Sequence, residues 1–275
     1  MALIEHLREF RNRLGISLLA LAVCVVVALI FREAVFDLVK RPYCDTQVAR
    51  EAAEASGRGC ELFAFNTFEQ LSVSLRVSLI VGVLASSPVW LYQFGAFITP
   101  ALHRKETRYT AAFLGASLVL FCIGVTFAVI TISRGLQFLL TFGGDGIVTL
   151  PSIQSYLSFV TLTLLGFGIA FLFPVVVLFL HFLGAFPAGK MRSWRRGMIV
   201  AIAVAAAVLT PSQDPFTFMA MALPLYALYE GCIVVARLHE KALRRRARAA
   251  VAGGQSLEQL SDDETSRVED RPSPL

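Results

Sequence analysis

Six apolar segments constrain this chain more than any other feature of its sequence. They cover residues 15–31, 72–98, 109–132, 155–183, 198–210 and 216–236. About 20 apolar residues in a helix cross the hydrocarbon core of a bilayer, which is roughly 30 Å thick. The composition agrees, because 56% of the 275 residues are hydrophobic and only 16% are charged, and a soluble domain of this length carries more charge. The pattern predicts an all-α integral membrane protein with six transmembrane helices.

The distribution of Lys and Arg predicts the orientation of these helices. Basic residues accumulate in cytoplasmic segments. Of the 25 basic residues, 16 lie before the first apolar segment, after the second, after the fourth, or at residues 237–248 just after the sixth. We therefore expect both termini in the cytoplasm. The first apolar segment has a charged flank but no small-residue cleavage pattern, so we expect it to remain as the first span.

One polytopic membrane domain, residues 1–238, is expected, followed by a tail at 239–275. The tail is basic at first and then rich in Ser, Asp, Glu and Pro, a composition typical of disorder. The sizeable outer loop, about residues 34–70, contains Cys44 and Cys60. These cysteines can pair on an oxidising outer face, which stabilises the loop by roughly 3 kcal/mol in the chain-entropy model; two free thiols are the alternative.

The last two spans are predicted to be short. Residues 198–210 rise only about 20 Å as a helix, and residues 216–229 are apolar for a similar length before Glu230. A short pair thins the bilayer locally or hides behind its neighbours; alternatively, the boundaries are wrong by a few residues. Asp214, in the connection between them, is a candidate for a structural or partner contact. Prolines inside three spans predict bent helices and a cupped bundle: Pro88, Pro174 and Pro224.

Two charged stretches at the expected cytoplasmic face carry acids in basic surroundings. In the first, Leu7, Phe10 and Leu14 form an apolar stripe, which predicts an interfacial amphipathic helix over residues 2–14 that runs into the first span. Glu9 lies four residues before Arg13, a spacing that favours a weak exposed ion pair. Glu106 belongs to the second stretch. These acids either keep the surface soluble or bind guanidinium groups, which a carboxylate engages through two parallel hydrogen bonds.

Four sequence motifs carry a family resemblance. Residues 6–14 read HLREFRNRL, close to the pattern H-L-x-E-L-R-x-R-L, and residues 87–102 read SPVWLYQFGAFITPAL. Residues 151–159 (PSIQSYLSF) and 209–211 (LTP) add further matches. With these motifs the chain resembles TatC, the six-span subunit of the twin-arginine protein translocase, over residues 6 to about 237.

The resemblance implies the function and the site residues. It implies a receptor for the paired-arginine signal peptides of folded cargo, with Glu9 and Glu106 binding the arginines. The supporting surface would comprise Arg11, Phe97, Pro100 and Leu102. A functional proline of the first outer loop matches Pro42. An acid and a base near the outer end of the second span match Glu69 and Arg76, either as a packed pair or as two side chains that reach separately to the interface.

The resemblance also implies the surroundings in which the chain works. It implies the bacterial cytoplasmic membrane, single-span TatA/TatB-type partner subunits, an oligomeric complex and export driven by the proton gradient. No site for ATP is recognisable in the sequence, no cofactor is expected, and no nucleic-acid partner is expected.

Two acidic positions leave alternatives open. Many relatives of this kind carry a glutamate in the fourth span, but this chain reads Phe-Leu-Phe-Pro there, with Leu172 in its place. Without this glutamate, any partner contact or proton step assigned to it in other members is in doubt. Gln154 and Thr161 are candidates for weaker polar contacts in its place. In the sixth span, Glu230 is predicted to pair with Arg237, to contact a partner helix, or simply to lie at the interface.

The remaining residues argue against catalysis. The four histidines are scattered without metal-ligand spacing, and we find no nucleophile motif or phosphate-binding glycine loop. We therefore predict a protein that is not an enzyme and holds no metal. The rival interpretations are a secondary transporter, which needs polar residues at mid-membrane, and an intramembrane enzyme, which needs a catalytic pair at membrane depth.

Overall fold

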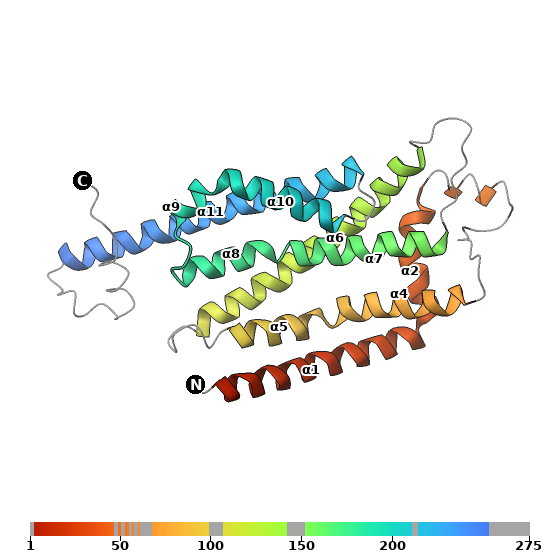
Figure 1. Cartoon of the computed structure of the whole chain (residues 1–275), viewed down its shortest axis with the longest axis horizontal. Coiled ribbons are helices and arrows are strands. Elements are labelled where there is room, and N and C mark those ends of the chain that lie inside the picture. Colours follow the sequence, from red (N-terminus) through yellow and green to blue (C-terminus); the bar gives the residue numbers. More distant parts are fainter. Residues whose placement is uncertain are drawn as a thin grey trace.

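The computed structural model of the chain describes residues 3–46, 49–50, 53–54, 57, 60, 68–98, 107–141, 152–210 and 214–252. Its regular elements in these ranges are α-helices, as predicted, and most of them run along one axis (Figure 1). The start of α1 and the end of α11 lie at the same end of the molecule, called here the terminal end. Helix α2 crosses the opposite end, called here the disulfide end.

The first helix is longer than its apolar segment. Helix α1 (Leu3–Ile30) continues without a break through the predicted amphipathic stretch. It packs mainly on α4 and α5, and the approach is closest at Gly82, where an added Cβ would lie 2.4 Å from a methyl carbon of Val25. The absence of a side chain at Gly82 therefore allows α1 to pack directly on α4.

The expected outer loop begins with a helix. Helix α2 (Arg32–Cys44) follows α1 after a single turn residue, so the prediction of a loop over its residues is wrong. Pro42 lies inside α2; its missing N–H removes one hydrogen bond near the end of the helix, where the loss is small. Val39 and Tyr43 are buried against the bundle, and this tertiary contact stabilises a helix that the sequence pattern did not reveal.

The second predicted span is a pair of helices bent by 54°. Helix α4 (Glu69–Ala85) ends just before Pro88, and α5 (Ser87–Ile98) begins there. The bend interrupts the regular backbone hydrogen bonds between the two helices, and Pro88 has no N–H to donate. Trp90 Nε1 donates to the oxygen of Val83 at 3.1 Å and Ser86 Oγ donates to the same oxygen at 3.2 Å. The predicted proline bend is therefore present, and polar side chains satisfy the exposed backbone.

Helices α6 and α7 form the centre of the bundle. Helix α6 (Thr107–Thr141) is longer than the predicted 109–132. It continues through Ser133 and Arg134, just past the apolar segment, because it packs on α7 and α11. Helix α7 (Ile153–Ala170) is followed by α8 (Phe173–Phe182), with a break just before Pro174. A Cβ at Gly124 of α6 would lie 2.8 Å from the oxygen of Phe167, so the two backbones are in close contact.

The last helices differ from the predicted short pair. Helix α9 (Ala188–Ser193) leads into α10 (Arg195–Leu209), which has 15 residues and rises about 22 Å. Helix α11 (Pro215–Ala252) has 38 residues, so the prediction of a short last helix is wrong. The residues beyond its apolar part are mainly Ala, Arg, Leu and Lys, which are strong helix formers, and Pro224 does not interrupt it.

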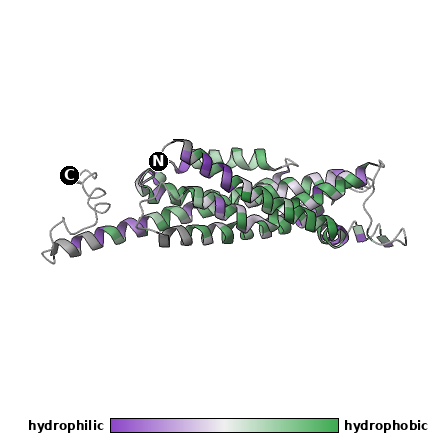
Figure 2. Cartoon of the chain, turned by 90° about the horizontal axis from the view of Figure 1, so that it is seen from below, coloured by the Kyte–Doolittle hydropathy of each residue, from purple (hydrophilic) through white to green (hydrophobic). Residues whose placement is uncertain are grey.

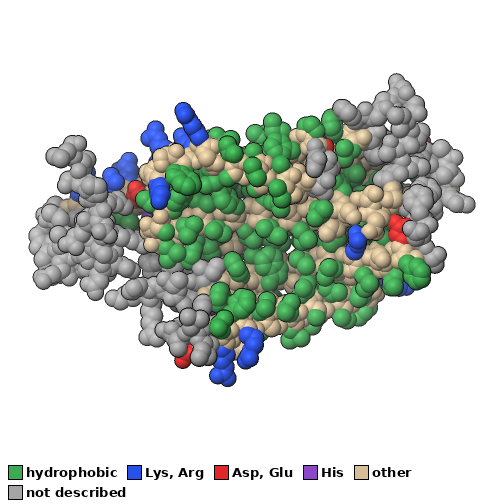
Figure 3. All heavy atoms as spheres, viewed as in Figure 1, with side chains coloured by type: hydrophobic (Ala, Val, Ile, Leu, Met, Phe, Trp, Pro, Cys, Tyr) green, Lys and Arg blue, Asp and Glu red, His purple; other side chains and the backbone are tan. Residues whose placement is uncertain are grey.

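The helices have the length and hydropathy of membrane spans. Among the residues that the structure describes, four helices are long and apolar enough to cross a membrane, and the bent pair α4–α5 would be a fifth. Helix α10 is shorter than a usual span, so the count of six remains a prediction. Most of the bundle is coloured as hydrophobic residues in Figure 2, and Figure 3 shows hydrophobic side chains over much of the visible described face. The chain is a multi-pass membrane protein.

Candidate functional site

At the terminal end, Glu9 of α1 is linked to a second helix through Arg13. Arg13 Nε and Nη2 donate to Glu9 Oε1 at 2.9 and 2.7 Å, which confirms the predicted ion pair. Arg13 Nη1 also donates to Gln93 Oε1 of α5 at 3.4 Å. The Glu9 and Arg13 side chains are 27% and 26% exposed, so water partly screens the pair and its contribution to stability is small.

An aromatic contact fixes the end of α5 beside α1. The ring centroids of Phe10 and Phe97 lie 5.4 Å apart. On the other side of α5, a Cβ at Gly95 would lie 2.2 Å from Leu114 Cδ2 of α6. Helices α1, α5 and α6 therefore converge at the terminal end, as Figure 1 shows. Arg11 is exposed on α1 near this junction.

Three of the predicted site residues lie outside the residues that the structure describes: Pro100, Leu102 and Glu106. They belong to the connection between Ile98, the last residue of α5, and Thr107, the first residue of α6. The end of α5 and the start of α6 both lie at the terminal end, beside the start of α1 (Figure 1).

Glu230 of α11 has a partner that the sequence did not indicate. Glu230 forms an ion pair with Arg195 at the start of α10, and Tyr226 donates to Glu230 Oε1 at 3.0 Å. The suggested partner Arg237 lies on the same helix, whereas Arg195 reaches Glu230 only because α10 packs on α11. This network joins the last two helices.

Two further contacts hold the short helix α9 against α11, and the sequence analysis missed both. Glu240 Oε1 accepts a hydrogen bond from the N–H of Ala188 at 2.9 Å, which satisfies one of the free donors at the start of α9. Tyr229 donates to the oxygen of Met191 at 2.8 Å. Nothing in the local sequence pairs these residues, which are separated by 52 and 38 positions.

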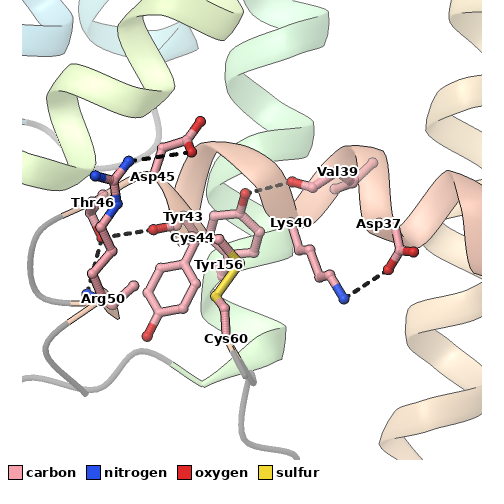
Figure 4. The surroundings of a disulfide bond; sticks show 11 residues. Asp37, Val39, Lys40, Tyr43, Cys44, Asp45, Thr46, Arg50, Cys60 and Tyr156 are labelled. Carbon is pink, nitrogen blue, oxygen red and sulfur yellow. Dashed lines mark hydrogen bonds and ion pairs between the residues drawn. A yellow bond between two sulfur atoms is a disulfide. The ribbon is translucent and has the colours of Figure 1, made fainter. Parts of the chain in front are cut away.

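Cys44 and Cys60 form a disulfide at the other end of the bundle, with their Cα atoms 5.7 Å apart (Figure 4). Next to it, Tyr156 of α7 donates to the oxygen of Val39 at 2.6 Å, and its ring centroid lies 5.7 Å from that of Tyr43. Burial raises the pKa of the Tyr43 phenol above its ordinary value. These contacts hold α2, which carries Pro42, against the end of α7.

Glu69 and Arg76, the predicted acid and base of α4, lie near the disulfide end. Arg76 Nη1 is 3.3 Å from Ser158 Oγ of α7. With the Gln154 amide turned so that its oxygen faces the guanidinium, both Nη atoms of Arg76 lie 3.0 Å from that oxygen. Glu69 is the acidic residue of the first turn of α4, where a negative charge favours the helix dipole. Its pairing with Arg76 stays a prediction.

Asp214 has a structural position at the start of α11. Its side chain is 5% exposed, and Oδ1 accepts a hydrogen bond from the N–H of Thr217 at 2.7 Å. This is the geometry of an N-cap, which satisfies a free donor in the first turn of a helix. Among the described residues no group of three or more His, Cys, Asp or Glu is placed to hold a metal ion.

Comparison with known proteins identifies the family of this chain. The family model described as Sec-independent protein translocase protein (TatC) matches residues 5–224, which is most of the chain. The chain belongs to the TatC family. It is a subunit of a Sec-independent protein translocase, a transport protein that acts in a complex with other Tat components.

Individual TatC proteins are similar over nearly the whole chain. The TatC of Frankia casuarinae is 44% identical over 271 residues, covering 98% of this chain and 73% of that protein. The TatC of Aquifex aeolicus is 36% identical over 241 residues, covering 86% of this chain and 95% of its own. A crystal structure described as the twin-arginine translocase receptor TatC in DDM matches with a TM-score of 0.71 and 35% identity, over 84% of this chain and 99% of that chain.

The predicted departure from other TatC sequences falls at a break in the fold. Leu172 lies between α7 and α8, where the chain leaves one helix and enters the next before Pro174. Its neighbour Phe171 is buried, with 1% exposure. Leu172 itself is half-buried.

Proposed function

We propose that this TatC chain is the signal-peptide receptor and core of its translocase, with Glu9 and Glu106 binding the two guanidinium groups of a paired-arginine signal peptide. The observation that carries the proposal is the Glu9–Arg13 contact. Two N–H groups of one guanidinium already lie within 2.9 Å of the Glu9 carboxylate, so the site accommodates this chemical group.

The position of Glu9 supports binding of a second guanidinium. Among the described residues, Arg13 donates only to Oε1, and no hydrogen bond is made to Oε2. An incoming arginine can therefore bind through Oε2 or displace Arg13. Because the internal pair is partly exposed and weak, its replacement costs little.

The convergence of α1, α5 and α6 supports the participation of Glu106. The Phe10–Phe97 contact and the Arg13–Gln93 hydrogen bond hold the end of α5 beside Glu9. The connection that contains Pro100, Leu102 and Glu106 starts from this end. In the proposal, the arginines bind there, and the apolar part of the signal peptide lies along a cupped face of the bundle.

The proposal includes the membrane arrangement expected from the sequence. The chain crosses a bacterial cytoplasmic membrane six times with both termini inside, and export uses the proton gradient. The pair α10–α11 faces single-span TatA/TatB-type subunits. Exposed valines on one face of α10 support this contact: Val200, Val204 and Val208 are 62%, 58% and 77% exposed. Failure of residues 198–210 to cross-link to any partner helix would contradict the assignment.

Site-specific photo-cross-linking tests the recognition step. Probes at positions 9 and 106 in native membranes should give strong adducts with a paired-arginine signal peptide and weak adducts with its paired-lysine version, because an ammonium cannot form two parallel hydrogen bonds. In a parallel binding assay, Glu9→Gln and Glu106→Gln should weaken peptide binding. Glu5→Gln, an exposed acid one turn earlier on α1, serves as the matched control. Equal adducts with both peptides would overturn the proposal.

A further inference from the structure

The final part of α11 presents a row of basic side chains that the proposed function does not use. Helix α11 extends past the other helices at the terminal end, as Figure 2 shows. Four basic residues in this extension follow the spacing i, i+4, i+7 and i+11, and a fifth lies next to them on the helix surface. All five are exposed. We call them the basic stripe: Arg237, Lys241, Arg244, Arg245 and Arg248.

The basic stripe lacks a counter-charge in the part of the chain that the structure describes. None of its five side chains takes part in an ion pair there. The nearby acids are engaged elsewhere, since Glu230 pairs with Arg195 and Glu240 bonds the N–H of Ala188. Like charges three and four residues apart oppose helix formation. An anionic partner would relieve this repulsion.

The sequence supplies such a partner directly after the helix. Residues 253–275 contain six acidic and two basic residues. Gly253 and Gly254 follow Ala252 at once, and glycine readily adopts the conformations that reverse a chain. The acids Asp262, Asp263 and Glu264 form the densest negative group.

The lengths match. From Arg237 to Ala252 the helix rises about 22 Å. The ten residues from Gly253 to Asp262 span up to about 33 Å when extended. The acidic group can therefore reach any part of the basic stripe. A covalently tethered segment also has a local concentration on the order of millimolar, so weak charge pairs suffice.

We propose that the acidic segment 258–270 of this chain binds the basic stripe of α11. An anionic lipid surface fits the stripe less well. Among the described side chains of α11, the last large exposed apolar one is Leu238, and Arg248 lies about 15 Å further along the helix. That distance exceeds the Debye length of about 8 Å at physiological salt, and α11 runs along the axis of the bundle (Figure 1). Only the first stripe residues lie within reach of headgroups.

Photo-cross-linking of the full chain in nanodiscs of phosphatidylcholine tests this contact, independently of signal-peptide recognition. A probe at Arg245 should label peptides of residues 255–275 roughly tenfold more than a probe at Leu243, which lies on the other face of the same turn. Labelling should fall several-fold when salt is raised, because exposed charge pairs are screened.

A charge-swap experiment separates a specific contact from chance collisions. Reversal of the tail acids (Asp262→Lys, Asp263→Lys and Glu264→Lys) should abolish labelling from position 245. Adding Lys241→Glu, Arg244→Glu and Arg248→Glu should restore it. Equal labelling from positions 243 and 245, or labelling that the tail reversal leaves unchanged, would overturn the proposal. So would adducts that, in native membranes, form only with anionic lipid or another protein.

Discussion

Helix α1 and the pair α7–α8 contain equally apolar stretches, but only the second is buried in the bundle. The most apolar 18 residues of Leu7–Ile30 and of Ile153–Phe182 both have a mean hydropathy of 2.6, yet 6% of the first stretch and 56% of the second is buried in the protein. In lipid, apolar side chains need no protein partner, so hydropathy identifies a span without placing it. The difference lies in composition: α7 mixes aromatic residues with small ones that allow close packing, including Thr163, Gly166 and Gly168.

The largest effect expected from this comparison comes from one matched pair of leucines. Leu157 of α7 is fully buried, whereas Leu19 of α1 is 66% exposed. Leu157→Ala should lower the free energy of unfolding by about 3 kcal/mol, because it leaves a cavity, while Leu19→Ala should change it by less than about 0.5 kcal/mol. Denaturation with SDS in mixed micelles measures both. Equal losses would mean that α1 is as central as α7.

Close backbone contacts should give the next largest effect. Gly124 faces α7, and an added Cβ there would lie 2.8 Å from the oxygen of Phe167, whereas nothing lies within 4 Å of a Cβ at Gly15 of α1. Gly124→Ala should cost about 2 kcal/mol, since neither backbone can move freely. Gly15→Ala should stabilise by up to about 1 kcal/mol through helix propensity. The same denaturation assay applies, and a neutral Gly124→Ala would show that α6 and α7 are less tightly packed.

A hydrogen bond ties the central helix to the disulfide end, and its loss should have a smaller effect. Tyr156→Phe removes the donor to the oxygen of Val39 and should cost about 1 kcal/mol. Tyr92→Phe on α5, where the side chain is 56% exposed, is the control and should be neutral. Hydrogen exchange of the α2 amides should rise in the first variant only. Unchanged exchange would show that the disulfide alone holds α2.

The smallest effect on stability, and the one most relevant to function, concerns α1. Arg13→Gln removes a partly exposed ion pair and should change the free energy of unfolding by about 0.3–0.5 kcal/mol. It also removes the internal competitor for Glu9, so cross-links from position 106 to a paired-arginine peptide should increase. Arg8→Gln, an exposed neighbour, should leave the yield unchanged. A fall in yield with Arg13→Gln would assign Arg13 itself to peptide binding.

Local sequence rules predicted much of the fold. Apolar segments indicated the spans, Pro88 and Pro174 marked breaks, and the four-residue spacing of Glu9 and Arg13 indicated their ion pair. Each of these depends on residues close together in the chain. The long-range contacts were missed or assigned to the wrong partner. The Glu230–Arg195 pair and the Glu240–Ala188 hydrogen bond join residues 35 and 52 positions apart, and no periodicity encodes them.

The sequence by itself determined that this chain is a multi-pass helical membrane protein, because an apolar run must form a helix to satisfy its backbone in lipid. Its motifs, by resemblance, pointed to the TatC family. It also indicated acids that suit guanidinium binding. Only the tertiary structure decided which spans are central, because lipid and protein interior are equally apolar. It also decided the length of α6 and the partner of Glu230, since packing between distant segments, not local propensity, sets where α6 ends and which charges meet.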